Sequence, residues 1–219
     1  NLDHVIHRVK TACEKVQRDP KEITIIGVTK YVTIERAKEL IQAGIHHIGE
    51  NRTDEFLTKY DSIGDDVSWH FIGTLQSRKT KDIIDQVDAI HSLDRLSLAK
   101  QIHRRANRQI DCFVQVNVSG ETTKHGIKPE EVIPFVKTLA PYTNVRVVGL
   151  MTMAPHTDDE NEIRHVFRRL AQLRDDVKEL SLPHAPCENL SMGMSNDYEI
   201  AIEEGATHIR LGSTLVGVD

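Results

Sequence analysis

The sequence predicts an α/β protein whose chain closes into a single (β/α)₈ barrel over residues 1–219. Eight short apolar segments have the length and composition of buried strands, and a helical pattern follows each of them. No segment rich in proline or glycine and no low-complexity sequence divides the chain into separate domains. The alternative fold, an open doubly wound sheet, usually carries a GxGxxG fingerprint after its first strand, whereas this chain reads "GVTKYV" there. The closed barrel is therefore the favoured fold.

An amphipathic helix precedes the first predicted strand. In residues 3–16, "DHVIHRVKTACEKV", the side chains of Val5, Val9, Ala12, Cys13 and Val16 recur with the spacing of one helical face. A helix with such an apolar stripe packs that face against a larger body. We therefore expect a TIM barrel with an extra N-terminal helix.

The eight predicted strands are short and mostly apolar, as expected for a parallel sheet that is covered by helices. In chain order they are residues 23–29, 45–50, 68–73, 87–92, 110–118, 145–151, 188–193 and 207–212. Two joints between helix and strand echo each other, since "LIQAGIHHIG" and "AIEEGATHIRLG" both read as a helix, a glycine stop and a strand. This repetition is typical of a fold built from successive helix and strand units.

The helices between the strands show start and stop signals. Thr33 is placed to cap the helix after the first strand, and Gly44 is placed to end it. Asp94 and Asp158 are placed to cap two later helices. Pro134 falls inside "PEEVIPFVKTL", so it must lie in the first turn of its helix or kink it. The longest helix presents an apolar stripe made of Ile163, Val166, Phe167, Leu170, Leu173 and Val177.

The composition is that of a soluble globular protein, with 39% hydrophobic and 28% charged residues. The net charge of -5 argues against nucleic acid as the main partner, because no positive field attracts phosphates. Three widely spaced cysteines form no CxxC pair, which favours a reducing cytoplasmic environment over a disulfide framework. The sequence has no apolar run of about 20 residues, and "NLDHVIHRVK" is no signal peptide, so we expect no membrane partner.

Lys30 is the first candidate for chemistry, because barrels of this kind place their working residues at the C-terminal ends of the strands. It follows the first apolar segment, and residue alternation places it on the same strand face as Ile26 and Val28. If that face lines the barrel, the amine projects into the mouth from an apolar floor, where burial favours its neutral, nucleophilic form. The alternative is a lysine that extends into solvent as the strand ends.

The loops after the seventh and eighth strands have the character of a phosphate site, which is a common role of these loops in barrels. The first, "SMGMSNDYEIAI", combines a tight turn at Gly193 with the hydroxyl of Ser195, and Ser195 or Asn196 can cap the helix that follows. The second, "THIRLGSTLVG", offers close backbone approach at Gly212 and the hydroxyl of Ser213. An ordinary capped turn is the alternative for the first loop.

Further polar residues occupy strand ends or strand interiors. Arg210 shares its strand face with Gly212 and should project into the mouth, where a ligand or a structural carboxylate could be its acceptor. Asn51 follows the second strand and could contact a ligand or cap the next helix, with Asp54 in its first turn. Barrel-lining and helix-facing positions are equally open for His70, Gln115 and Asn117.

An amine after the first strand, anion-binding loops after the seventh and eighth, and an arginine between them describe a pocket for a phosphorylated aldehyde. Pyridoxal 5′-phosphate is one such molecule, and a sugar phosphate held as a Schiff base is another. The spacing of the residues does not decide between them.

Several stretches of the chain carry a family resemblance. They are "GVTKYV", "IGENRTDE", "WHFIGTLQSRK", "DRLSLAKQI", "VQVNVSGETTKHGI", "RVVGLMTMAP" and "LSMGMSNDYEIAIEEGATHIRLGSTLVG". Together they resemble the pyridoxal phosphate homeostasis protein family, whose barrel is similar to the N-terminal domain of alanine racemase. The resemblance covers nearly the whole chain.

The resemblance implies a cofactor and a role for each candidate residue. It implies that pyridoxal 5′-phosphate is bound and that Lys30 carries it as a Schiff base. By the same motif matching, Asn51 lies beside the cofactor and Arg210 faces its pyridine nitrogen. The phosphate is held by residues of the last two loops, namely Ser195, Gly212 and Ser213.

Two functions are compatible with this resemblance. A carrier binds pyridoxal 5′-phosphate reversibly and passes it to apoenzymes, whereas an amino-acid racemase uses Lys30 as a base. In alanine racemase, as the relationship implies, a C-terminal domain supplies a second base, and we expect no such domain because this chain ends with "GVD" soon after the eighth strand. A charged arginine opposite the ring nitrogen also weakens carbanion chemistry. We therefore expect a monomeric, cytoplasmic homeostasis protein without robust turnover, and a sugar-phosphate aldolase is the third hypothesis.

Overall fold

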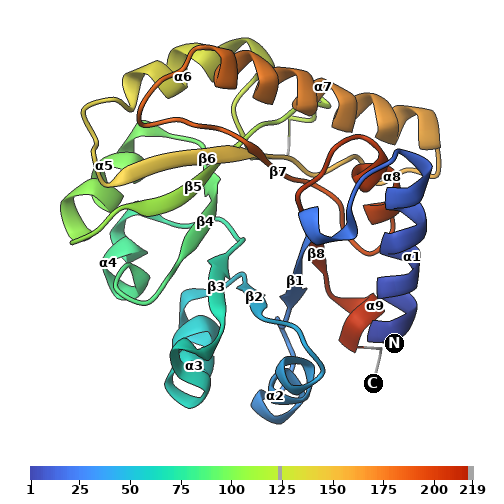
Figure 1. Cartoon of the computed structure of the whole chain (residues 1–219). Coiled ribbons are helices and arrows are strands. Elements are labelled where there is room, and N and C mark those ends of the chain that lie inside the picture. The colour runs from blue at the N-terminus through green and yellow to red at the C-terminus, as the bar shows by residue number, and fades with distance from the viewer. Residues whose placement is uncertain (123–124, 217–219) are drawn as a thin grey trace.

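The computed structural model is a closed barrel of eight parallel strands with helices packed around it (Figure 1). The structure describes residues 1–122 and 125–216. Residues 123–124, inside the "VQVNVSGETTKHGI" stretch, and residues 217–219, which include the final "GVD", lie outside the described part. The predicted (β/α)₈ barrel is confirmed.

Each predicted strand is found, and the strands follow one another around the barrel in chain order. Their bounds are β1 Thr24–Val28, β2 His47–Glu50, β3 Ser68–Phe71, β4 Ala89–Leu93, β5 Ile110–Gln115, β6 Val145–Met151, β7 Asn189–Ser191 and β8 His208–Leu211. The barrel closes where β8 pairs with β1, in a register that sets Ile26 opposite Arg210 and Gly27 opposite Leu211. The first and last strands are therefore neighbours.

The helices lie on the outer face of the barrel. The α-helices are α1 Leu2–Lys15, α2 Ile34–Gln42, α3 Thr53–Ile63, α4 Thr80–Ile83, α5 Leu96–Arg105, α6 Val132–Thr138, α7 Glu160–Glu179, α8 Tyr198–Glu203 and α9 Ser213–Val216. Short 3₁₀ helices are η1 Pro20–Glu22, η2 Gly64–Asp66, η3 Ser77–Lys79 and η4 Pro129–Glu131. Within the described residues, no helix is both long enough and apolar enough to cross a bilayer.

The extra N-terminal helix α1 packs against the last part of the chain, beside α8 and α9 (Figure 1). Its predicted apolar stripe is buried except at Val16, which follows the last helical residue and is exposed. Arg8 on the polar side of the helix pairs with Glu199 of α8. The Arg8 guanidinium also lies 5.5 Å from the centre of the Tyr198 ring. The helix therefore covers the region where the barrel closes.

The capping signals were informative for two helices. The Thr33 hydroxyl accepts a hydrogen bond from the Arg36 N–H at 3.1 Å, and α2 ends before Gly44, whose φ of 116° requires glycine. Pro134 lies in the first turn of α6, where a proline costs no helical hydrogen bond. These three predictions are confirmed.

Two predicted caps are wrong. The carboxylate of Asp94 does not cap α5, because it accepts from the Gly126 N–H at 3.2 Å and pairs with Arg95. The cap of α7 is Asp159 instead of Asp158, since the Asp159 carboxylate accepts from the first helical N–H groups. A cap depends on which neighbouring donors are in reach, and the sequence does not show those of distant loops.

The side chains of the strands alternate between the barrel interior and the layer under the helices. The outward layer joins the helices in one large apolar core that includes Trp69, Phe56 and Phe167. Inside the barrel, Phe113 packs with Val148 and Met151 in a separate small cluster. Polar side chains fill much of the remaining interior, which is unusual for a space that water does not reach.

Gly149 of β6 lies where the backbone of β7 approaches most closely. A Cβ at this position would lie 2.3 Å from the carbonyl oxygen of Asn189. We predict that Gly149→Ala lowers the free energy of unfolding by roughly 2 kcal/mol or more, because two hydrogen-bonded strands must separate. Denaturant titration measures this. The control is Gly27→Ala, whose Cβ would meet a movable side-chain methyl of Ile45 at 3.1 Å; equal losses for both variants would contradict the prediction.

Candidate functional site

Four adjacent strands bring most of the predicted site residues to one end of the barrel. Lys30 follows β1, Asn51 follows β2, and the loops of Ser195 and Ser213 follow β7 and β8. Because these strands are parallel and neighbouring, their C-terminal ends share one mouth. A Cβ added to Gly212 would lie 3.7 Å from the Cβ of Val28, so the ends of β8 and β1 are in contact.

Lys30 does not lie on the apolar floor that we expected. Strand β1 ends at Val28, and Lys30 occupies a turn with an exposed side chain, followed by Tyr31 at a φ of 62°. The expectation that this amine is buried is therefore wrong. The physical reason is that the chain leaves the sheet at Val28, one residue earlier than predicted, which carries the amine out to solvent.

A buried ion pair lies next to the residue that precedes Lys30. The Nζ atom of Lys59 in α3 lies 2.5 Å from Oε1 of Glu50, and both side chains are nearly inaccessible to solvent. The Thr29 hydroxyl donates to the same oxygen at 2.5 Å, and the Lys59 ammonium also donates to the Thr29 carbonyl oxygen. Burial raises the pKa of Glu50, while the hydrogen bonds from Lys59 and Thr29 act in the opposite direction. The ion pair therefore holds the backbone of Thr29, immediately before Lys30, in place.

The sequence did not reveal this pair. The available signal was weak: Lys59 falls three residues after the buried Phe56, on the apolar face of α3, and Glu50 ends an apolar strand. Each position alone reads as a surface charge at the edge of an element. Only the packing of α3 against the ends of β1 and β2 brings the two charges together.

Asn51 has a side-chain oxygen that is available for a ligand. The alternative, that Asn51 caps α3, does not hold, because the residue at the cap position is Arg52, although Asp54 lies in the first turn as expected. Among the described residues, the buried Oδ1 atom of Asn51 has no hydrogen-bond partner. An unpaired buried oxygen costs free energy, so a donor supplied by a ligand would be favourable here.

The loops after β7 and β8 are joined by their hydroxyl groups. Oγ of Ser195 lies 3.1 Å from Oγ1 of Thr214, in the first turn of α9. The predicted cap of α8 by Ser195 or Asn196 is wrong, since Asp197 occupies that position and accepts from the Met194 N–H at 2.8 Å. Ser195 instead faces the beginning of α9, where its hydroxyl oxygen accepts from the Thr214 N–H at 3.5 Å, while the N–H groups of Leu215 and Val216 donate to the Gly212 carbonyl oxygen.

Arg210 projects into the barrel interior, as predicted, and is 3% exposed. Its guanidinium donates to the Ser191 hydroxyl at 2.6 Å and to the Thr152 carbonyl oxygen at 3.2 Å. Burial lowers the pKa of Arg210 to about 10, so the side chain stays charged at neutral pH. Within the described residues no carboxylate forms an ion pair with it, which argues against the structural carboxylate that we considered.

The three residues left open in the sequence have different positions. His70 lines the barrel interior, where it lies between two other histidines. Gln115 is buried at the end of β5, and its backbone carbonyl oxygen accepts from the Ile127 N–H at 3.0 Å. Asn117 stabilises the loop that follows β5. Its side-chain amide donates to the Glu121 carbonyl oxygen at 2.7 Å and accepts from the Gly120 N–H at 3.1 Å.

Comparison with known proteins places the chain in a family. Residues 1–219 match the family described as "Alanine racemase, N-terminal domain". The pyridoxal phosphate homeostasis protein of Aquifex aeolicus is 42% identical over 99% of this chain and 96% of its own length. The chain belongs to the pyridoxal phosphate homeostasis protein family. The resemblance noted from the motifs is thereby confirmed.

Solved structures agree with this family assignment. PipY of Synechococcus elongatus PCC7942, which was solved with PLP bound, has 29% sequence identity and a TM-score of 0.84. The alignment covers 96% of this chain and all of PipY. The alanine racemase of Corynebacterium glutamicum shares the fold alone, with 16% identity and a TM-score of 0.72, and this chain spans 61% of that chain. The barrel of the homeostasis protein family therefore has a counterpart inside a longer racemase.

The buried pair of Glu50 and Lys59 generates a prediction about stability. Lys59→Met leaves the Glu50 carboxylate buried without its cation, which we expect to cost about 3–5 kcal/mol of unfolding free energy. The loss should grow between about pH 5 and about pH 8, because the Glu50 carboxyl ionises readily in the unfolded chain but only at a cost in the folded protein. Denaturant titration across this range measures both effects.

Two controls accompany the Lys59 variant. Lys38→Met removes an exposed lysine of α2 and should change the stability little. Adding Glu50→Gln to Lys59→Met should recover part of the loss, since no charge then remains buried. A Lys59→Met variant as stable as wild type would show that the pair contributes nothing.

Proposed function

We propose that this protein binds pyridoxal 5′-phosphate, holds it as a Schiff base on Lys30, and serves the homeostasis of this cofactor by carrying it without robust turnover. The observation that supports this function best is the meeting of the Lys30 turn with the hydroxyl-linked loops of Ser195 and Thr214 at one barrel mouth. Relatives named pyridoxal phosphate homeostasis proteins, and PipY solved with PLP bound, support the same proposal.

The residues at the mouth fit the chemistry of this cofactor. A phosphate needs N–H and O–H donors, and the Ser195 hydroxyl and the first turn of α9 supply donors of both kinds. The unpartnered Oδ1 atom of Asn51 offers an acceptor nearby. The exposed amine of Lys30 is accessible to an aldehyde that arrives from solvent. When bound, pyridoxal 5′-phosphate supplies an amine-reactive aldehyde and a ring that can accept electrons.

Each candidate residue then has one task. Lys30 binds the aldehyde carbon, and Asn51 contacts the cofactor from its side. Arg210 faces the ring nitrogen from the barrel interior. The phosphate is bound by Ser195, Gly212 and Ser213.

Arg210 favours carriage over catalysis. A carboxylate beside the ring nitrogen keeps that nitrogen protonated and strengthens the ring as an electron acceptor. The buried guanidinium is charged and can only donate, so it opposes a proton on the ring nitrogen. Carbanion chemistry on amino acids should therefore be slow at this site.

A racemase-like enzyme is the second candidate, because the chain matches the alanine racemase N-terminal domain family. In that function Lys30 is the base that removes the α-hydrogen of an amino acid. We also propose that residues 1–219 form a single cytoplasmic, monomeric domain, and that apoenzymes requiring pyridoxal 5′-phosphate receive the cofactor. The pairing of β1 with β8 supports one folding unit, since neither end of the barrel closes without the other.

The first prediction for this function concerns Lys30. Protein incubated with pyridoxal 5′-phosphate should turn yellow, and borohydride should attach the cofactor permanently to Lys30, as peptide mass spectrometry will show. Lys30→Ala should be colourless and should not be labelled. The matched control, Lys38→Ala, should behave as wild type because Lys38 is exposed on α2, away from the mouth. Full labelling of the Lys30→Ala protein at another lysine would overturn the assignment.

The second prediction separates carrier from racemase. The loaded protein, incubated with L-alanine and other amino acids in deuterated water, should leave their α-hydrogens unexchanged, because Arg210 weakens the ring as an electron acceptor. Proton NMR of the amino acids measures the exchange. Exchange at the turnover rates typical of enzymes, about 1 per second or faster, would replace the carrier by the racemase.

A further inference from the structure

A chain of hydrogen bonds crosses the barrel interior and starts at Arg210. The Arg210 guanidinium donates to Oγ of Ser191 at 2.6 Å, and the same Oγ lies 2.8 Å from Nδ1 of His91. Nε2 of His91 lies 2.8 Å from Nδ1 of His70, and Nε2 of His70 lies 3.0 Å from Nδ1 of His47. These five side chains, here called the histidine chain, come from β8, β7, β4, β3 and β2.

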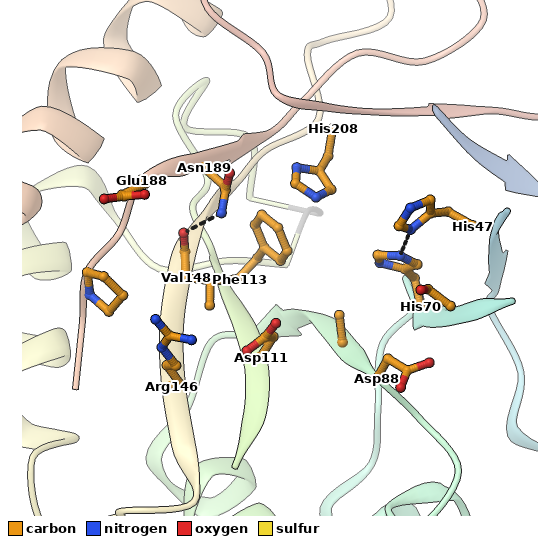
Figure 2. Close-up of a pocket in the computed structure, with 13 residues that line it drawn as sticks. His47, His70, Asp88, Asp111, Phe113, Arg146, Val148, Glu188, Asn189 and His208 are labelled. Carbon is orange, nitrogen blue, oxygen red and sulfur yellow. Dashed lines mark hydrogen bonds between the residues drawn. The ribbon is translucent and has the colours of Figure 1, made fainter. Parts of the chain in front are cut away.

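The histidine chain leads away from the candidate cofactor site to the opposite end of the barrel. Ser191 is the last residue of β7, whereas His47 is the first residue of β2. His47 and His70 line a cavity of about 330 Å³ at the N-terminal mouth (Figure 2). Arg210, Ser191, His91 and His70 are all buried, so the chain is shielded from water along most of its length.

The chemistry of the two ends determines which nitrogen of each ring carries a proton. An arginine has donors only, so Oγ of Ser191 accepts from Arg210 and directs its one hydrogen to Nδ1 of His91. A neutral His91 then carries its hydrogen on Nε2 and donates to Nδ1 of His70, and His70 donates in the same way to His47. His47 is left with an Nε2–H that points toward the N-terminal cavity.

Burial keeps these rings neutral. It lowers the pKa of His70 and of His91 well below the ordinary value, and it lowers the pKa of His47 as well. The ring of His91 also stacks on Phe113, with the centroids 4.2 Å apart and the planes 17° apart. A charged His91 would be unfavourable in the apolar environment beside Phe113, and it would break the hydrogen bonds of the chain.

We propose that Arg210 imposes one direction on the histidine chain, so that His91, His70 and His47 all carry their hydrogen on Nε2, and that the chain couples the N-terminal mouth to Arg210. A proton added to Nδ1 of His47 removes the acceptor of His70. The chain must then reverse or break, and in the reversed order the hydroxyl hydrogen of Ser191 loses its acceptor within the chain. The contact between Ser191 and Arg210 changes as a result. His47, His70, His91 and Ser191 are thus positioning residues for Arg210.

Charged and titratable groups from the surrounding elements line the cavity into which His47 opens (Figure 2). Asp88 favours a proton on His47, whereas the neighbouring His46 opposes it. The other titratable or charged groups that line the N-terminal cavity are Asp111 of β5, Arg146 of β6, Glu188 before β7 and His208 of β8. Burial lowers the pKa of His208 to about 4, so His208 is neutral at neutral pH. The mouth therefore presents His47 as the part of the chain that exchanges protons with solvent.

The test uses cofactor-free protein labelled with ¹⁵N-histidine and ¹⁵N-arginine, so its outcome does not depend on the proposed function, to which Arg210 is linked. At about pH 7.5, long-range ¹H–¹⁵N spectra should show the protonated nitrogen of His91, His70 and His47 at Nε2. A hydrogen on Nδ1 of either His91 or His70 in the wild-type protein would overturn the assigned direction.

Two variants test the coupling. Ser191→Ala removes the hydroxyl that fixes His91, so both tautomers of His91 should appear, while Ser62→Ala, at an exposed serine of α3, should change nothing. When the pH is lowered, the ¹⁵N signals of the Arg210 guanidinium should shift with the midpoint of His47, and His47→Gln should abolish that shift. Arg210 signals that ignore the titration of His47 would refute the coupling, even if the wild-type tautomers agree with the proposal.

Discussion

The parallel hydrogen bonding between β8 and β1 is the constraint on which the rest of the structure depends. Closure of the barrel sets Gly27 opposite Leu211, so the turn of Lys30 and the loop of Ser213 leave the sheet side by side although they are far apart in sequence. An open sheet would place its first and last strands at separate edges. The amine and the loop that we propose to bind phosphate could then not share one mouth. The N-terminal helix reinforces this closure, because it packs on α8 and α9 beside the seam.

The barrel interior contains the buried charge of Arg210, which needs hydrogen-bond acceptors. A buried guanidinium is costly unless its donors are satisfied, and here Arg210 is satisfied by the neutral acceptors Ser191 and Thr152. Both acceptors are neutral, so Arg210 has no directly paired carboxylate among the described residues, although the Asp197 carboxylate acts to raise its pKa. A charged side chain without a direct partner suits the proposed position opposite the ring nitrogen. The same choice of Ser191 joins Arg210 to the histidine chain. Ser191 therefore links Arg210 to the histidines that lead to the N-terminal mouth.

The turn of Lys30 combines an exposed side chain with a backbone that is held in place. The amine is open to solvent, where an incoming aldehyde can reach it without a change in the barrel. The backbone just before it is held by Thr29, whose hydroxyl and carbonyl oxygen are both bound by the Glu50 and Lys59 pair. The proposed role as a reversible carrier would benefit from this arrangement, because loading and release need access while the position of the amine must stay defined.

The sequence by itself determined the fold, since the alternation of apolar segments and helical stripes is a local property that survives in any context. It also determined that Arg210 points inward, because strand side chains alternate with a period of two. The exposure of Lys30, the caps at Asp159 and Asp197, the pair of Glu50 and Lys59, and the histidine chain were decided only by tertiary structure. Each of these depends on atoms from segments distant in the chain, and hydrogen bonds act over about 3 Å, a separation that residue order does not encode.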